Sequence, residues 1–222
     1  MDIGGYMMKI SKYVLVICSI LLLVGCNFEE STEEKLSEIL TEIYDLEADY
    51  RDVQEELAET ESKEQVNFQQ MMELTKDQKD ELTTMVEDTA TLLETRLGLV
   101  EKEAASINAT SDVIKKINTL ISETKEATEK ENLKQMETSL QERISAYEEV
   151  TNNYTELAEM QKDLYSMLVD ESADVTVIQE RVQEVNTHNE LVKQSVQKFN
   201  DATVRVNKVT EEVLTSLQKE DE

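Results

Sequence analysis

The sequence predicts an all-α protein, an elongated antiparallel up-down four-helix bundle with coiled-coil-like packing. The first observation is composition: the chain of 222 residues has no Pro and 4 Gly, and it is rich in residues that favour helices. The second is a repeated spacing of three and four between apolar residues, which gives each helix one apolar seam. The third is that four spans of similar length, 32–73, 76–124, 129–169 and 177–218, alternate with short turns, which favours antiparallel neighbours.

The length of these spans sets the expected shape. At about 1.5 Å per residue, each span is roughly 60–75 Å long as a helix, and the 3.5-residue period predicts a left-handed twist. One chain can bury its four seams together in a single bundle. Alternatively, two extended helical hairpins bury their seams by dimerising, and the sequence leaves both arrangements open.

The first 25 residues have the features of a secretory signal peptide. Two lysines precede an apolar run over 13–24, which ends at Gly25-Cys26. A basic segment, a short apolar segment and small residues before the cut are typical of such a signal. The run has 12 residues, whereas a membrane-spanning helix needs about 20. An uncleaved membrane helix over 10–24 is the alternative interpretation.

The sequence Leu23-Val24-Gly25-Cys26 resembles the lipobox of bacterial lipoproteins. This resemblance implies cleavage between Gly25 and Cys26 and a lipid, with acyl chains such as palmitate, on the Cys26 thiol. Two acyl chains give a stable membrane anchor, whereas one gives only marginal binding. We therefore expect a signal peptide over 1–25, a lipidated tether over 26–30, a helical bundle over 31–218 and a disordered tail over 219–222. Translation starts at Met1 or at Met8.

The first helix is expected over 32–73. Ser31 with Glu34 forms a capping box at its start. Its seam is spaced 3-4-3-4 and consists of Leu36, Ile39, Ile43, Leu46, Tyr50, Val53 and Leu57. The seam then fades over 58–67 and resumes at Phe68, Met71, Met72 and Leu74. A break near Ser62 is the alternative to one continuous helix.

Three further capping boxes mark the starts of the later helices. They are Thr75 with Gln78, Thr128 with Glu131, and Thr176 with Gln179. The second seam consists of Leu82, Val86, Ala90, Leu93, Leu97, Val100, Ala104, Ile107, Ile114 and Ile121. The third consists of Leu133, Met136, Leu140, Tyr147, Val150, Tyr154, Leu157, Leu164 and Leu168, with Arg143 and Gln161 in the same register. The fourth consists of Ile178, Val182, Val185, Asn189, Val192, Val196, Phe199, Thr203, Val206, Thr210, Val213 and Leu217.

The charge of the chain narrows the range of partners. Cleavage before Cys26 leaves 20 basic and 48 acidic residues, a net charge of −28. Such a charge argues against nucleic acid and against direct attraction to anionic lipids or wall polymers. We interpret the acidity as solvated helix faces, with specific cation binding as the alternative. Cys18 lies in the signal and Cys26 carries the lipid, so packing alone must hold the mature fold.

The mature chain has few residues suited to catalysis. Its single His, His188, adjoins the seam position Asn189, and we expect a half-exposed helix residue there. A di-metal bundle needs several Glu-x-x-His motifs, whereas only Glu184 stands four residues before His188. Few glycines are present to form a phosphate-binding loop. The sequence therefore predicts no catalytic residue, no cofactor and no metal site, and we expect Asn189 to fix helix register.

The tyrosines are the other candidates for a binding surface. Tyr50, Tyr147 and Tyr154 lie on seams and Tyr165 lies next to one. We expect these four to pack in the core with their hydroxyls at its rim. Tyr44 is off its seam and is the candidate for an exposed contact.

The chain resembles the YkyA-type family of cell-wall-binding lipoproteins from Bacillus-like bacteria. The resemblance is carried by the lipobox with Cys26, by Glu142-Arg143, Tyr147-Glu148 and Tyr154, by Asp163-Leu164-Tyr165-Ser166-Met167-Leu168, and by Val185-Asn186 through Phe199-Asn200. It implies a Gram-positive cell, an exported protein anchored in the outer leaflet and a role in binding the wall. Only Cys26 transfers from the family as a functional residue.

Two functions are therefore weighed. The first is a membrane-anchored extracellular lipoprotein that acts as a cell-wall-binding or structural helical protein without enzymatic activity. Its partners would be the membrane, through the lipid on Cys26, and peptidoglycan or teichoic acid bridged by divalent cations. The alternative is a helical adaptor or chaperone-like protein that binds another membrane or secreted protein. A homodimer is compatible with either function.

Overall fold

The computed structural model describes residues 31–218, and this part of the chain is helical and contains no strand. It has six α-helices and one short 3-10 helix. Their bounds are α1 Thr32–Leu46, α2 Ala48–Asp52, α3 Gln54–Glu73, η1 Lys76–Gln78, α4 Lys79–Glu123, α5 Ala127–Val169 and α6 Val175–Gln218. The all-α prediction is confirmed, whereas the expected signal, tether, Gly25, Cys26 and tail lie outside the described residues.

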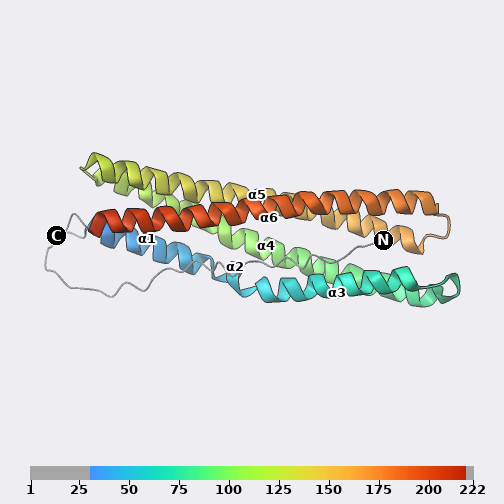
Figure 1. Cartoon of the computed structure of the whole chain (residues 1–222). Coiled ribbons are helices and arrows are strands. Elements are labelled where there is room, and N and C mark those ends of the chain that lie inside the picture. Colours follow the sequence, from blue (N-terminus) through green and yellow to red (C-terminus); the bar gives the residue numbers. More distant parts are fainter. Residues whose placement is uncertain (1–30, 219–222) are drawn as a thin grey trace.

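The helices form an elongated molecule in which α1, α2 and α3 follow one another along α4 (Figure 1). Helix α5 packs between α4 and α6, and α1 also contacts α6. The described chain begins and ends at the same end of the molecule, where Gln218 Nε2 donates a hydrogen bond to Glu33 Oε1 at 2.9 Å. The turns before α4 and before α6 lie at the other end (Figure 1). We call these the near end and the far end.

The capping boxes have mixed outcomes. Ser31 and Glu34 form the predicted box, with Glu34 N donating to Ser31 Oγ at 3.1 Å and Ser31 N donating to Glu34 Oε2 at 3.0 Å. The Thr75 box also forms, but it begins the 3-10 turn η1, so α4 starts at Lys79. The predictions for Thr128 and Thr176 were wrong, because α5 already begins at Ala127 and α6 at Val175. There the Asp174 carboxylate, before α6, accepts a hydrogen bond from Thr176 N at 2.7 Å.

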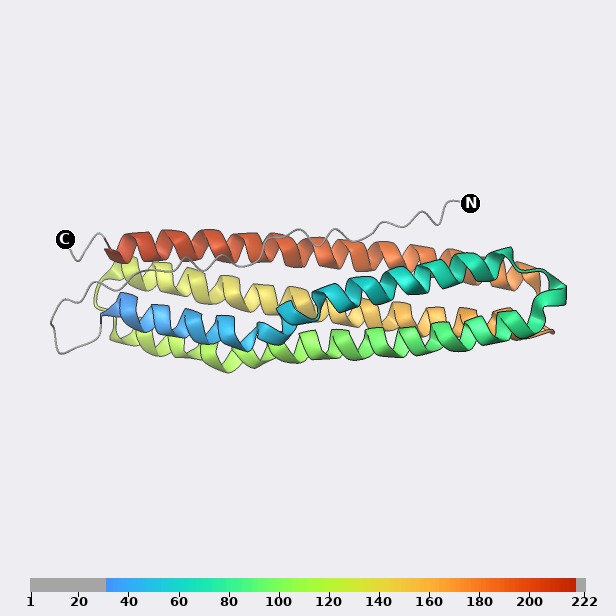
Figure 2. The same ribbon diagram turned by 90° about the horizontal axis from the view of Figure 1, so that it is seen from below.

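The prediction of one helix over 32–73 was wrong, and so was the alternative break near Ser62. The chain there forms three helices, interrupted at Glu47 and Val53. Figure 2 shows the change of direction between α1 and α3. Both interruptions lie within the most regular part of the predicted seam, so local sequence does not cause them. At Glu47 the helical ladder is interrupted by Ser106 of α4, whose hydroxyl bonds both Leu46 O and Tyr50 N.

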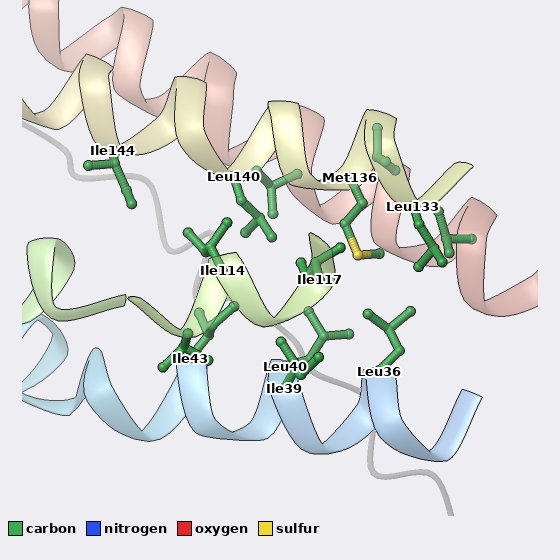
Figure 3. Close-up of a cluster of buried hydrophobic side chains, with 14 of the residues drawn as sticks. Leu36, Ile39, Leu40, Ile43, Ile114, Ile117, Leu133, Met136, Leu140 and Ile144 are labelled. Carbon is green, nitrogen blue, oxygen red and sulfur yellow. The ribbon is translucent and has the colours of Figure 1, made fainter. Parts of the chain in front are cut away.

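Most predicted seam residues are buried, in three clusters along the molecule. The largest lies at the near end and joins α1, α4, α5 and α6 (Figure 3). Its fully buried members include Leu36, Ile107, Ile117, Leu133 and Met136. Met72 is an exception to the prediction, since 46% of it is exposed.

The far end is packed differently. Its cluster consists of Met71, Leu93, Ala158 and Tyr165, from α3, α4 and α5, with partly buried neighbours from the same helices. No residue of α6 belongs to it, and no Cα of α3 lies within 8 Å of a Cα of α6. Val175, Val177 and Leu191, in the first half of α6, are exposed. Val185 and Val192 of the same half join the middle cluster with Leu57 of α3 and Val100 of α4.

The region over 58–67 does not interrupt the seam; it makes the seam polar. Thr60 and Glu64 continue the spacing from Leu57 and are buried, with 5% and 2% exposed.

None of the helices between Ser31 and Gln218 combines the length and apolar character required to cross a membrane.

Candidate functional site

Polar side chains line the middle of the molecule, between the two end clusters. On α4, Thr89, Arg96, Glu103 and Thr110 are all buried and stand seven residues apart. Seven residues are two turns of a helix, so these four share one face. One of the core positions of α4 is therefore polar over four successive heptads, beside the apolar positions of the predicted seam.

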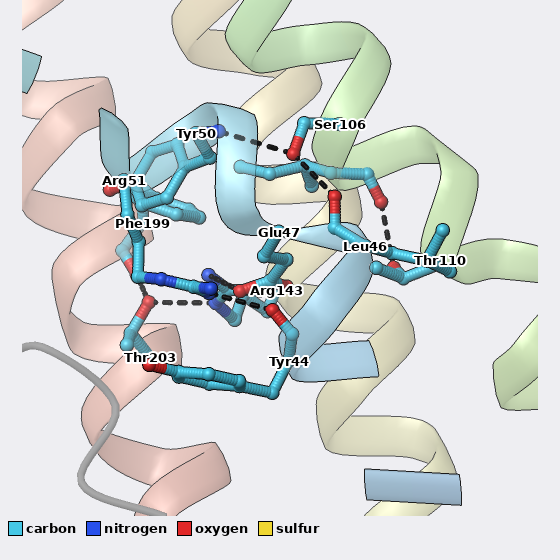
Figure 4. Close-up of polar contacts among 11 residues, drawn as sticks. Tyr44, Leu46, Glu47, Tyr50, Arg51, Ser106, Thr110, Arg143, Phe199 and Thr203 are labelled. Carbon is cyan, nitrogen blue, oxygen red and sulfur yellow. Dashed lines mark hydrogen bonds and ion pairs between the residues drawn. The ribbon is translucent and has the colours of Figure 1, made fainter. Parts of the chain in front are cut away.

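The interruption at Glu47 is built around Ser106 of α4. The Ser106 hydroxyl donates to the carbonyl oxygen of Leu46 at 2.7 Å and accepts from the amide of Tyr50 at 3.2 Å (Figure 4). In a continuous helix, that amide would bond that carbonyl directly. A side chain inserted into this ladder is a recognised cause of a kink. The amides on either side keep their bonds, Glu47 N to Ile43 O at 3.1 Å and Arg51 N to Glu47 O at 3.2 Å.

A buried ion pair lies beside this interruption. Arg143 of α5 makes a two-pronged contact with the Glu47 carboxylate, and the Nη2–Oε2 distance is 3.1 Å (Figure 4). Arg143 Nε also donates to Thr203 Oγ1 of α6 at 3.0 Å. The two charged side chains are only 4% and 3% exposed. The pair thus ties the α1–α2 junction to α5 and α6 without contact with bulk water.

Glu103 forms a second polar centre one turn away on α4. Its carboxylate accepts a hydrogen bond from Tyr147 Oη at 2.5 Å and another from the side-chain amide (Nε2) of Gln54, the first residue of α3. Burial raises the pKa of Glu103 to about 7, and the hydrogen bonds only partly oppose this. Burial also raises the pKa of Tyr147, as does the nearby Glu103. Gln54 Oε1 has no hydrogen-bond partner among the described residues.

Aromatic rings close this centre on the side of α6. Tyr50 and Phe199 both meet Tyr147 edge to face, with centroids 5.8 Å and 4.9 Å away. Together with Glu103 and Gln54 they line a cavity of about 40 Å³. A cavity of this size holds about one water molecule, so it is not a binding site for an organic ligand.

A third polar centre lies toward the far end. Arg96 Nη1 of α4 lies 3.0 Å from Glu64 Oε2 of α3, and both side chains are buried. The other Glu64 oxygen accepts from Tyr165 Oη at 2.8 Å, while Tyr154 Oη donates to Glu61 Oε1 at 2.5 Å. Burial raises the pKa of Glu64, and Arg96 opposes that change. Helix α3 is therefore held to α4 and α5 largely through buried polar groups.

A large surface depression lies between α5 and α6, toward the far end of the molecule. It has a volume of about 450 Å³ and is lined by Met160, Glu180, Gln183, Glu184, Thr187, His188 and Leu191. His188 Nε2 lies 2.9 Å from Asn153 O and 3.7 Å from Glu156 Oε2. His188 is half-buried, as expected for a structural residue on the helix.

The tyrosine predictions are partly corrected. Tyr147, Tyr154 and Tyr165 are buried as predicted, and Tyr50 is half-buried. The hydroxyls of Tyr147 and Tyr165 bond buried carboxylates and do not reach the rim, whereas the Tyr154 hydroxyl bonds the half-buried Glu61. Tyr44 is half-buried, because the guanidinium of Arg51 lies 3.8 Å from its ring centroid. It is therefore not the exposed contact that we expected.

Sequence reasoning missed most of the acidic members of the polar core. A signal was present: Thr60 and Glu64 keep the seam spacing, and Arg96 and Glu103 stand seven residues apart between predicted core positions. Within residues 31–218, no group of three His, Asp or Glu side chains is arranged to hold a metal ion.

The model of the YkyA family, described as "Putative cell-wall binding lipoprotein", matches residues 31–216. The chain belongs to the YkyA family. The match covers all but the last two residues of the described region, so the helices α1, α2 and α3 and the polar core all lie within the matched region. No curated protein and no solved structure matches the chain.

Proposed function

We propose that this chain is an exported lipoprotein, anchored through a lipid on Cys26 at the outer face of the cell membrane, that binds the cell wall without enzymatic activity. The observation that carries the proposal is the match to the YkyA family over 31–216, whose description names both a lipoprotein and cell-wall binding. The lipobox residues Gly25 and Cys26 stand directly before that region.

The arrangement of the helices supports a role that depends on reach. Only the four residues 27–30 separate Cys26 from the capping residue Ser31. The helical region thus starts close to the anchor and extends away from it by about 65 Å, the length of a 44-residue helix such as α6. We further propose that α1, α2 and α3 act as one rod, which with α4, α5 and α6 makes an up-and-down bundle of four rods.

The acidity of the chain limits how it can bind the wall. Its net charge of −27 opposes direct contact with anionic wall polymers. We propose that it binds peptidoglycan, or teichoic acid through bridging divalent cations. Electrostatic bridges of this kind weaken with added salt and vanish with a chelator.

Two experiments test this function. Cys26→Ala in the full-length chain should abolish lipid labelling and release the protein or leave it as an uncut precursor, whereas Cys18→Ala should leave labelling unchanged. A labelled, membrane-bound Cys26→Ala protein would contradict the anchor.

Co-sedimentation tests the proposed binding to the wall. The protein is mixed with purified peptidoglycan, or with walls that retain teichoic acid, with and without magnesium, salt and chelator. Absence of the protein from every wall pellet would refute the binding role.

A second candidate is a helical adaptor that binds another membrane or secreted protein. The observation that favours it is that three apolar residues in the first half of α6, Val175, Val177 and Leu191, are exposed. Crosslinking on intact cells distinguishes the two functions. One discrete protein adduct, without retention by the wall, would favour the adaptor.

A further inference from the structure

The buried carboxylates of the protein differ in what balances their charge. Among residues 31–218, three carboxylates are buried, those of Glu47, Glu64 and Glu103, with 2%, 2% and 4% of each residue exposed. Arg143 pairs with Glu47, and Arg96 pairs with Glu64. Glu103 has no arginine, lysine or histidine within ion-pair distance in this part of the chain. Because an unpaired buried charge is costly, Glu103 needs either a proton or a cation.

The hydrogen bonds around Glu103 favour its charged form. Both printed partners donate to the carboxylate, Tyr147 through its hydroxyl and Gln54 through Nε2. Donors of this kind stabilise a carboxylate relative to the neutral acid. Burial acts in the opposite direction and raises the pKa to about 7, so the group is charged in mildly alkaline solution. Its surroundings therefore hold a negative charge in place without supplying a positive one.

A small cavity with a second unsatisfied group adjoins this carboxylate. Glu103 and Gln54 both line the cavity of about 40 Å³. Gln54 Oε1 is buried and has no hydrogen-bond partner among the described residues. Tyr50 and Asn200 line the same cavity and bring two further side-chain oxygens to it. These four residues belong to α4, α3, α2 and α6, respectively.

We propose that this cavity binds one monovalent alkali cation, sodium or potassium, between the Glu103 carboxylate and Gln54 Oε1. The Tyr50 and Asn200 side-chain oxygens are the further ligands. Oxygen atoms are the ligands that hard cations prefer, and one carboxylate balances one positive charge. The aromatic rings of Tyr147 and Phe199 close the cavity, and a low dielectric strengthens the attraction between ion and carboxylate.

The size and charge of the cavity exclude other cations. It holds about one water molecule, which is close to the size of a dehydrated alkali ion and too small for an organic amine. Calcium is typically bound by several carboxylates. Within residues 31–218, no three acidic or histidine side chains are grouped to hold a metal ion. The ion would link the α2–α3 junction to α4 and α6, so its binding should stabilise the folded protein.

Urea unfolding of the full-length chain in a non-ionic detergent tests the site. Sodium, potassium and N-methylglucamine chlorides are exchanged for one another at a constant ionic strength of about 0.15 M and at about pH 8.5. Constant ionic strength is needed because any salt screens the self-repulsion of a chain with a net charge of −27. N-methylglucamine is the control, since it is too large for the cavity.

A bound ion has a defined effect on this equilibrium. Above its dissociation constant, each tenfold rise in the bound cation should raise the folding equilibrium constant about tenfold. Equal stability in all three salts would overturn the proposal, and Glu103 would then be neutralised by a proton.

The tyrosines give a second measurement that locates the ion. The chain has no Trp, and Tyr50, Tyr147 and Tyr154 line the cavity. Titration with the stabilising cation should change the near-ultraviolet circular dichroism of the folded protein to saturation, and N-methylglucamine should not. Stabilisation without this change would place the ion elsewhere and overturn the proposal.

Matched variants on α4 assign the binding to one carboxylate. Glu103→Gln removes the charge and keeps the shape, so both responses to the cation should disappear. Glu101→Gln, on the exposed face of the same turn, should keep them. Responses that persist in Glu103→Gln would overturn the assignment. Should that variant fail to fold by far-ultraviolet circular dichroism, Gln54→Leu, which removes the unsatisfied oxygen, should shift the titration of the native protein to higher concentration, and an unshifted titration would equally overturn it.

Discussion

The buried pair of Glu47 and Arg143 gives the most demanding test of how the polar core is built. Replacing Arg143 by Met keeps most of the volume of the side chain but leaves the Glu47 carboxylate, only 3% exposed, without its partner. Breaking a buried pair in this way typically costs about 3–5 kcal/mol. For a chain of this size, about 2–4 °C of melting temperature is lost per kcal/mol. Arg143→Met should therefore melt about 6–20 °C below the native protein.

The cost comes from the orphaned charge, so removing both charges should restore stability. The double variant Glu47→Leu with Arg143→Met replaces the pair by apolar groups, and such replacements are often neutral or stabilising. Urea unfolding, followed by circular dichroism on the full-length chain, measures both variants. The control is Arg205→Met, which breaks an exposed pair with Glu142 at 2.5 Å and should cost less than about 1 kcal/mol.

Two outcomes would refute this account of the pair. A single variant Arg143→Met within about 1 kcal/mol of the native protein would mean that Glu47 is solvated or protonated at little cost. A double variant as unstable as the single would mean that the stability comes from geometry that only these two residues supply, such as the bond from Arg143 Nε to Thr203.

Three further predictions concern the interruption at Glu47, the seam of α6 and the pH dependence of stability. Ser106→Ala should lower the free energy of unfolding in urea by about 1–3 kcal/mol, because Leu46 O and Tyr50 N lose their shared partner. The control is Thr95→Ala, whose hydroxyl bonds the carbonyl of Thr91 within its own exposed turn. An equal loss in the two variants would contradict this prediction. Val196→Asp should lower the free energy of unfolding by several kcal/mol, since Val196 packs against two core clusters. Val204→Asp, on the exposed face of the same helix, should cost much less. Equal melting temperatures for the two variants would show that the seam of α6 is not buried. The pKa of Glu103 rises from 4.5 to about 7 on folding. Its contribution to the free energy of unfolding is therefore fully present below pH 4.5 and is lost as the pH rises through about 7, by at most about 3 kcal/mol. Glu103→Gln should remove this part of the pH dependence of urea unfolding, and an unchanged profile would refute the assignment.

The regular part of the fold was predictable because it depends on local periodicity. Apolar spacing identified the long helices α4, α5 and α6 within three residues of their ends, and the capping box at Ser31 placed the start of α1. The breaks at Glu47 and Val53 were not predictable in this way. The hydroxyl inserted at the first break belongs to Ser106, 56 residues after Tyr50, and no local rule connects the two.

The polar core was missed because the search for a seam followed apolar residues only. Glu64 occupies a seam position, but as a charged residue it is expected on a solvent-exposed face of the helix. What keeps it buried is Arg96 and Tyr165, from two other helices. Charged residues are rarely fully buried unless they are paired, and a pairing between helices depends on their relative register, which one sequence does not fix.

The position of the chain ends has a practical consequence for work on intact cells. The bond between Gln218 and Glu33 places the last turn of α6 beside the start of α1, whereas the segment 170–174 lies at the opposite extremity (Figure 1). If the chain is anchored through Cys26 as proposed, an epitope tag fused behind Gln218 would sit at the base of the molecule, near the membrane and beneath the surrounding wall polymer. The same tag inserted between Asp170 and Asp174 would stand about 65 Å higher. Antibody access to these two tags would report the orientation of the molecule and the depth of the layer around it.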